Sequence, residues 1–135
     1  MRILLDTHIA LWAILNDKLL PIKARDLIID PDNTIFYSSV STWEVLLKHA
    51  DDPKNLYINV RQFIGYCTSS GFIPVNLTNK HIAAVETLTL HENSPKHKDP
   101  FDRLLIAQAK CENMLFLTHD SRLKFYDEPC VFTVQ

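Results

Sequence analysis

The chain has 135 residues, of which 47% are hydrophobic and 22% charged, and its formal net charge is −2. This length fits one compact domain, and the hydrophobic fraction is too high for a disordered chain. The small negative charge argues against a general attraction for nucleic acid. Carboxylates gathered around divalent cations would nevertheless reverse the sign of the charge locally.

The predicted elements follow one another as short strands and helices. In chain order they are a strand at 3–5, helices at 8–15 and 21–29, a strand at 34–37, helices at 41–50 and 59–70, a strand at 72–75, helices at 79–88 and 99–113, and strands at 114–117 and 131–134. Pro21 is placed in the first turn of its helix, and Gly71 is a C-terminal cap. Thr78 caps the helix that follows it.

Short apolar strands separated by helices predict an α/β fold with a parallel sheet covered on both faces. In such sheets, ligands bind beyond the carboxyl ends of the strands. That edge is therefore where we look for chemistry.

The sequence offers no membrane helix, secretion signal or disulfide framework. Its apolar runs are short, such as Leu104 to Ala107, whereas a transmembrane helix needs about 20 residues. Asp6 interrupts the N-terminal apolar stretch too early for a signal peptide. The three cysteines are widely spaced and form no Cys-x-x-Cys pair. We expect a cytoplasmic protein, without membrane association, whose residues 1–135 form a single domain.

Five carboxylates fall at the predicted carboxyl edge. Asp6 and Asp120 follow strands, Asp99 and Asp102 open a helix that leads into a strand, and Glu44 lies in the first turn of a helix that follows a strand. Clustered carboxylates repel one another, so such a group is favourable mainly around a cation. Oxygen ligands suit Mg²⁺ or Mn²⁺, and two such ions about 4 Å apart can promote hydrolysis of a phosphodiester.

Most of these carboxylates also have a structural interpretation. Ser41 and Glu44 are spaced as a capping box, and Glu44 precedes Lys48 by four residues, which favours a helical ion pair. Asp99 followed by Pro100 is a typical helix start. Asp120 is also suited to a turn, whereas Asp6 gains least from a purely structural role, although it can cap the next helix. Both interpretations stay open at this point.

Other polar and aromatic residues are weaker candidates. His8 and His119 follow predicted strand ends and are candidates for substrate or metal contact, although polar loop positions explain them as well. Trp12 and Trp43 lie on apolar helical faces, so we interpret them as core or interface residues rather than base-stacking platforms. Lys96, His97 and Lys98, together with Arg103, are candidates for binding phosphate, against the alternative of a solvated loop.

Four segments, in order, resemble motifs of PIN domains. They are Ile-Leu-Leu-Asp-Thr-His at 3–8, the serine-rich segment 38–46 with its glutamate, Lys-Asp-Pro-Phe-Asp-Arg-Leu-Leu-Ile-Ala-Gln-Ala at 98–109, and Leu-Thr-His-Asp at 117–120. The third is the most specific and is very similar to the central helix of one VapC-like subgroup. The resemblance covers essentially the whole chain.

The resemblance implies a three-layer α/β/α sandwich with a mostly parallel central sheet. It further implies a Mg²⁺- or Mn²⁺-dependent endoribonuclease that acts as the VapC-like toxin of a type II (VapBC) toxin–antitoxin pair. Its partners would be RNA, a VapB-like antitoxin and, in a homodimer, a second copy of the chain. Asp6, Glu44, Asp102 and Asp120 fall on the family's acidic quartet, and Asp99 is a further acidic position of the subgroup.

Within this hypothesis Asp6 and Asp102 are the main metal ligands, Asp99 and Asp120 serve a second ion or its waters, and Glu44 orients or deprotonates the attacking water. Which of Asp99 and Asp102 touches metal directly stays open. Three alternatives also remain: a housekeeping RNA-processing nuclease, a non-catalytic binding module with the PIN fold, and a phosphotransfer enzyme that uses an acidic pocket.

Overall fold

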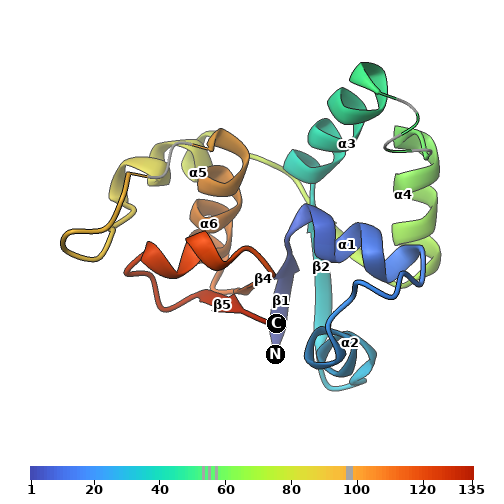
Figure 1. Cartoon of the computed structure of the whole chain (residues 1–135), viewed down its shortest axis with the longest axis horizontal. Helices are drawn as coiled ribbons and strands as arrows, with labels where there is room; N and C mark the ends of the chain where they lie inside the picture. Colours follow the sequence, from blue (N-terminus) through green and yellow to red (C-terminus); the bar gives the residue numbers. More distant parts are fainter. Residues whose placement is uncertain (53, 55, 57, 97–98) are drawn as a thin grey trace.

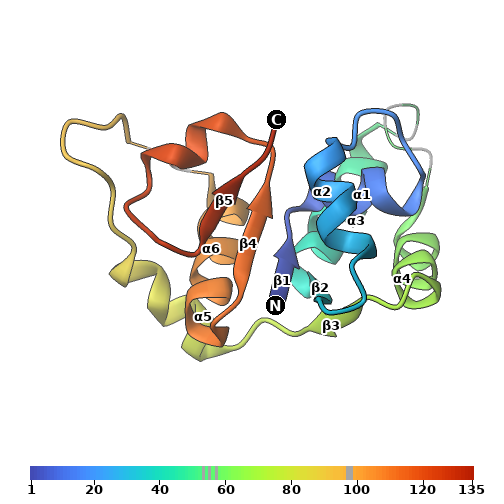
Figure 2. The ribbon, with the colours of Figure 1, turned by 90° about the horizontal axis from the view of Figure 1, so that it is seen from below.

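The computed structural model describes residues 1–52, 54, 56, 58–96 and 99–135. Its strands form one parallel sheet in the order β3-β2-β1-β4-β5, seen side by side in Figure 2. Each strand lies within one residue of its predicted bounds: β1 (Arg2–Leu5), β2 (Thr34–Ser38), β3 (Ile73–Val75), β4 (Leu115–Thr118) and β5 (Val131–Thr133).

Helices cover both faces of this sheet. They are α1 (Thr7–Ile14), α2 (Ile22–Ile29), α3 (Ser39–Asp51), α4 (Val60–Ser69), α5 (Asn79–Ala84) and α6 (Pro100–Glu112). In Figure 1, α1, α2 and α4 lie to one side of the strands, and α5 and α6 lie to the other. The three-layer α/β/α sandwich is therefore confirmed, with a sheet that is parallel throughout. No helix in the described part of the chain is both long and apolar enough to cross a membrane.

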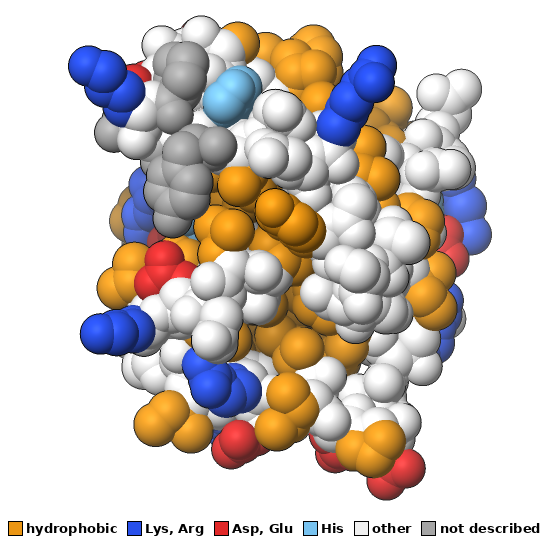
Figure 3. All heavy atoms as spheres, turned by 90° about the vertical axis from the view of Figure 1, so that its right-hand side faces the viewer, with side chains coloured by type: hydrophobic (Ala, Val, Ile, Leu, Met, Phe, Trp, Pro, Cys, Tyr) orange, Lys and Arg blue, Asp and Glu red, His pale blue; other side chains and the backbone are white. Residues whose placement is uncertain are grey.

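Alternating side chains of β1 join two hydrophobic clusters. Ile3 and Leu5 belong to the cluster that includes Ile9 of α1 and Phe63 of α4. Leu4 points to the opposite face and packs in the cluster formed with α6. A strand that is buried on both faces is typical of a parallel sheet between two helical layers. On the surface of the molecule, the face that carries α4 exposes hydrophobic side chains gathered between polar ones (Figure 3).

The start of α3 differs from the prediction. The helix begins at Ser39, and its N-cap is Ser38, whose hydroxyl accepts a hydrogen bond from the Val40 backbone N–H at 3.0 Å. The capping box predicted between Ser41 and Glu44 is therefore wrong, because Ser41 already lies inside the helix and is fully buried. Glu44 therefore does not cap the helix, and its side chain is available at the carboxyl edge of the sheet.

Other helix ends follow their predicted signals with small shifts. Asp99 caps α6, with Pro100 in the first turn, and Gly71 takes the left-handed conformation after α4 with φ of 81°. Pro21 is the N-cap of α2 rather than its first helical residue. The helix capped by Thr78 ends at Ala84 and continues only as a 3₁₀ turn (Val85–Thr87).

The strand order creates a switch point next to β1. The chain runs from β1 to β2 and β3 on one side, and then returns to place β4 on the other side of β1. Helical connections therefore leave the carboxyl ends of β1 and β4 in opposite directions, which opens a crevice between them. Asp6 follows β1 directly, and Asp120 follows β4 after one intervening residue.

Candidate active site at the carboxyl edge of the sheet

A hollow of about 470 Å³ lies at this switch point and is called the acidic hollow here. All five carboxylates singled out in the sequence line it. Its lining residues are Asp6, His8, Trp12, Glu44, Lys48, Asp99, Phe101, Asp102, His119, Asp120 and Arg122. The fold thus brings together side chains from the ends of β1 and β4 and from the helices α1, α3 and α6.

Asp6 is the most deeply placed of the five, with only 7% of its surface exposed. One carboxylate oxygen accepts a hydrogen bond from the Thr7 backbone N–H at 2.7 Å, so Asp6 also caps α1. The other accepts one from the Thr118 hydroxyl at 2.5 Å. Burial raises the pKa of Asp6 to about 6, helped by the nearby charges of Glu44 and Asp120 and opposed by these two hydrogen bonds.

Two threonines hold the carboxylates in place, and the sequence analysis did not identify either. The Thr118 hydroxyl, at the end of β4, donates to Asp6 and accepts from the Asp120 backbone N–H at 3.1 Å. The Thr7 hydroxyl donates to Glu44 at 2.7 Å and lies 2.8 Å from the Ser41 hydroxyl. Their position beside strand-end aspartates was the available signal, because residues next to a site's carboxylates commonly supply its supporting hydrogen bonds.

Glu44 is held at both oxygens. One oxygen accepts from Thr7, and the other lies 2.9 Å from the Lys48 ammonium, which confirms the predicted helical pair. The Glu44 side chain is 13% exposed and Lys48 is 42% exposed. Glu44 therefore has a fixed orientation at the wall of the acidic hollow, with the Lys48 ammonium beside it.

Asp102 carries the strongest electrostatic effect of the cluster. The pKa of its carboxyl is raised to about 8, first by burial and then by the charges of Asp6, Asp99, Asp120 and Glu44, in that order. Asp99 has one oxygen already engaged in capping α6. That oxygen accepts hydrogen bonds from the backbone N–H groups of Phe101 and Asp102 at 2.9 and 3.0 Å. Both residues line the acidic hollow, as their spacing of three on a helix predicted.

Asp120 caps a short 3₁₀ helix (Ser121–Phe125) that the sequence analysis missed. Its carboxylate also forms an ion pair with Arg122 at 2.7 Å. Among the residues that the structure describes, Arg122 and Lys48 are the Lys and Arg side chains that line the acidic hollow, and Arg103 does not line it. Of the basic loop considered for phosphate binding, His97 and Lys98 lie outside the described residues.

The two candidate histidines both line the acidic hollow. Burial lowers the pKa of His8, as does the neighbouring Lys48, while Glu44 and Asp120 oppose this shift. His119 is tied to the backbone through its Nδ1, which lies 2.9 Å from the Val134 carbonyl oxygen.

The donor set of the acidic hollow fits a hard divalent cation. Its carboxylates offer oxygen ligands, as Mg²⁺ and Mn²⁺ prefer, and burial, together with the neighbouring carboxylates, raises the pKa values of Asp6 and Asp102. Within the residues that the structure describes, no three His, Cys, Asp or Glu side chains already converge at metal-ligand distances.

Comparison with known proteins identifies a family. A family model described as PIN domain matches residues 3–129. No curated protein matches the sequence.

Several solved structures share the fold. A chain of VapBC2 from Rickettsia felis, bound to a promoter DNA fragment, is 19% identical over 100% of both chains, with a TM-score of 0.69. DNA-bound VapBC from Salmonella typhimurium is 12% identical over 98% of each chain, with a TM-score of 0.65. VapBC-1 from nontypeable Haemophilus influenzae is 15% identical over 92% of this chain and 93% of that chain, with a TM-score of 0.59. At such low identities the similarity is one of fold.

Proposed function

Because the chain belongs to the PIN-domain family, whose members are generally nucleases, we propose that it is a divalent-metal-dependent endoribonuclease and the toxin of a VapBC-like pair. The proposal rests on one observation above all. Five carboxylates from separate segments line one hollow at the switch point of the sheet, and burial and their mutual repulsion raise the pKa of Asp102 to about 8. Such a cluster is stable in its ionised form mainly around a cation.

Asp6 and Asp102 would be the main ligands, and Asp120, Asp99 and Glu44 would complete the set. A bound Mg²⁺ or Mn²⁺ would supply the charge that lets these carboxylates ionise together, polarises a phosphodiester and makes water more acidic. Thr118 and Thr7 prepare the site, because their hydroxyls fix the orientation of Asp6 and Glu44.

Glu44 would act on the attacking water. Its two oxygens are held by Thr7 and Lys48, so the carboxylate keeps a fixed orientation at the wall of the acidic hollow. It would orient the attacking water and accept its proton. Lys48 and Arg122 would offer positive charge to the phosphates on either side of the scissile bond.

The proposed reaction is hydrolysis. The oxygen of water forms a bond to phosphorus, and the bond from phosphorus to the 3′ oxygen breaks. Glu44 accepts a proton from the attacking water, and the departing 3′ oxygen takes a proton from solvent, which leaves a 5′-phosphate end and a 3′-hydroxyl end. No covalent intermediate on the protein is needed.

The experiment that tests this proposal is sequencing of RNA ends after brief expression of the chain, with a variant that lacks Asp6 as the control. New 5′-phosphate ends that depend on Asp6 support the proposal. Growth arrest on expression separates a toxin from a housekeeping nuclease. Absence of both cleavage and Mn²⁺ binding by the purified protein would leave a non-catalytic module, and labelling of Asp6 by an acyl-phosphate donor would favour phosphotransfer.

The proposal includes a protein partner and a second copy of the chain. The three solved structures described above are of VapBC proteins, and two of them are bound to DNA. We expect this chain likewise to pair with a short DNA-binding antitoxin and to form a homodimer. Co-expression with the product of a neighbouring short reading frame should relieve growth arrest, and light scattering of the purified chain should give twice the mass of one chain.

Replacing Thr118 with valine should weaken binding of Mn²⁺ by about 10-fold to 100-fold, which is typical when a hydrogen-bond partner of a metal ligand is lost. Valine keeps the shape of threonine but removes the hydroxyl that orients Asp6 and accepts from the Asp120 N–H. Isothermal titration with Mn²⁺ measures the effect. Thr118→Ser retains the hydroxyl and is the matched control, so equal losses in the two variants would contradict this role.

A further inference from the structure

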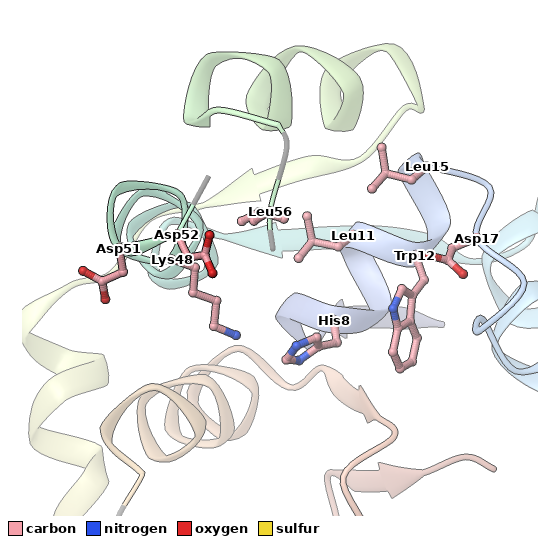
Figure 4. Close-up of a pocket in the computed structure, with 9 residues that line it drawn as sticks. All are labelled: His8, Leu11, Trp12, Leu15, Asp17, Lys48, Asp51, Asp52 and Leu56. Carbon is pink, nitrogen blue, oxygen red and sulfur yellow. The ribbon is translucent and has the colours of Figure 1, made fainter. Parts of the chain in front are cut away.

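A second hollow of about 450 Å³ adjoins the acidic hollow and is called the side hollow here. Figure 4 shows its lining residues, which come from α1, from the C-terminal end of α3 and from the segments that follow these two helices: His8, Leu11, Trp12, Leu15, Asp17, Lys48, Asp51, Asp52 and Leu56. His8, Trp12 and Lys48 line both hollows. The two spaces therefore share a wall, and a ligand bound at the carboxylates can reach the side hollow.

Trp12 is the aromatic residue of that shared wall. Its indole is close to two imidazoles, with ring centroids 5.8 Å from His8 and 5.5 Å from His119. The sequence analysis interpreted Trp12 as a core or interface residue, and part of the ring does pack against the core that includes Leu11. Trp12 also lines both hollows, so it is exposed to a ligand in either of them.

The chemistry of the side hollow favours an uncharged flat group over a phosphate. Leu11, Leu15 and Leu56 supply apolar walls. The charged side chains are Asp17, Asp51, Asp52 and Lys48, so carboxylates outnumber the cation and would repel a nucleic-acid backbone. The same carboxylates can accept hydrogen bonds from the amino groups of nucleobases. Lys48 also lines the acidic hollow, where a phosphate is expected.

We propose that the side hollow binds one unpaired base of single-stranded RNA, stacked against Trp12, while the neighbouring phosphate lies at Lys48 beside the carboxylates. This inference rests on the proposed function, because it adds a base-binding subsite beside the same site. Bases that stack on aromatic side chains must be unpaired and turned out of a helix. The chain should therefore bind and cleave single strands or loops in preference to duplex RNA.

Tryptophan fluorescence tests the proposal without altering Trp12. The chain has two tryptophans, so Trp43→Phe leaves Trp12 as the only indole emitter, and Asp6→Asn in the same protein prevents cleavage. A pool of single-stranded RNAs of about 12 nucleotides with random sequence is the probe, since single-strand sites span about 4–16 nucleotides. We expect the RNA to quench Trp12 emission, and we expect little quenching from duplexes of the same length or from abasic strands.

Variants of Trp12 give the second readout. Base stacking on an aromatic residue corresponds to a loss of about 5-fold to 150-fold in affinity when the ring is removed. Trp12→Leu in the Asp6→Asn background should therefore weaken RNA binding within that range, Trp12→Phe should weaken it less, and Trp43→Phe should leave it unchanged. Circular dichroism melting of each variant shows that the fold is retained.

The outcomes separate this inference from the proposed function. If the parent binds and cleaves RNA but Trp12→Leu binds it equally well, the base site is wrong and the nuclease stands. In that case the apolar side hollow is available to a protein segment instead. Equal quenching by duplex and by single strands would also overturn the base site. If the parent neither binds nor cleaves RNA, both proposals fail together.

Discussion

Replacing Asp6 with asparagine is expected to lower RNA cleavage by about 100-fold or more while the protein stays folded, because the substitution removes a charge that the reaction needs and almost no volume. The Asp6 carboxylate is 7% exposed and lies at the switch point between β1 and β4. Cleavage of a labelled RNA with Mn²⁺ in excess measures the effect.

The structure explains why this variant should fold. Asparagine is as good an N-cap as aspartate, so its side-chain oxygen can keep the hydrogen bond from the Thr7 N–H that begins α1. The Thr118 hydroxyl, which now donates to Asp6, can instead accept from the new amide. Removing a buried carboxyl whose pKa is raised to about 6 also relieves repulsion at neutral pH.

Asp26→Asn is the matched control, because Asp26 is an exposed aspartate within α2 and does not line the acidic hollow. It should cleave RNA as the parent does. An Asp6→Asn protein that melts like the parent and still cleaves at the parental rate would contradict the proposed mechanism.

The second large effect is a dependence of stability on pH that a divalent cation removes. The pKa of Asp102 is about 8 in the folded protein, against an ordinary value of 3.8. Between these values the folded protein holds a proton that the unfolded chain has released, so the free energy of unfolding falls as pH rises from about 4 to about 8. In the presence of EDTA, we expect the melting temperature to fall across this range.

Mn²⁺ should restore the lost stability at pH 8 and have little effect near pH 5, because it binds the ionised carboxylates and competes with the protons. Asp102 is partly exposed, and water screens its charge, so we expect about 1–2 kcal/mol, or a shift in melting temperature of about 3–8 °C. Differential scanning calorimetry at a series of pH values, with EDTA or Mn²⁺, measures it.

Asp102→Asn is the decisive variant for this prediction. It should melt at a higher temperature than the parent at pH 8 in EDTA, it should show a flatter pH dependence, and it should gain less from Mn²⁺. Asp26→Asn should follow the parent throughout. A parent whose stability in EDTA rises between pH 5 and pH 8 would show that the carboxylates of the acidic hollow do not carry the repulsion inferred here.

Local signals in the sequence were enough for the strands, for the order of the α-helices and for naming the five carboxylates that line the acidic hollow. Each strand is confirmed to within one residue, since an apolar run bounded by polar residues has few alternatives. Asp99 with Pro100 correctly predicted the start of α6, because an N-cap and a proline in the first turn act only on their immediate neighbours. The Glu44–Lys48 pair was predictable for the same reason.

The capping box at Ser41 shows where a local signal was misleading. Ser38 and Ser41 are both suitable caps, and the choice depends on where β2 ends and on the contact that Ser41 makes with Thr7, 34 residues away. Local preference cannot decide between these two caps, because the tertiary structure buries Ser41 inside the helix and leaves Ser38 as the N-cap. With the helix starting at Ser39, Glu44 turns toward Thr7 and the acidic hollow.

By itself the sequence determined the order of strands and helices, the family to which the chain belongs and which carboxylates follow strand ends. Only the tertiary structure decided that Thr118 supports Asp6 across 112 residues and that Trp12 lines two adjoining hollows rather than the core alone. The reason is physical: periodicity and capping depend on near neighbours, whereas the pKa of Asp102 and the partners of Asp6 depend on groups that only the packing of the sheet brings together.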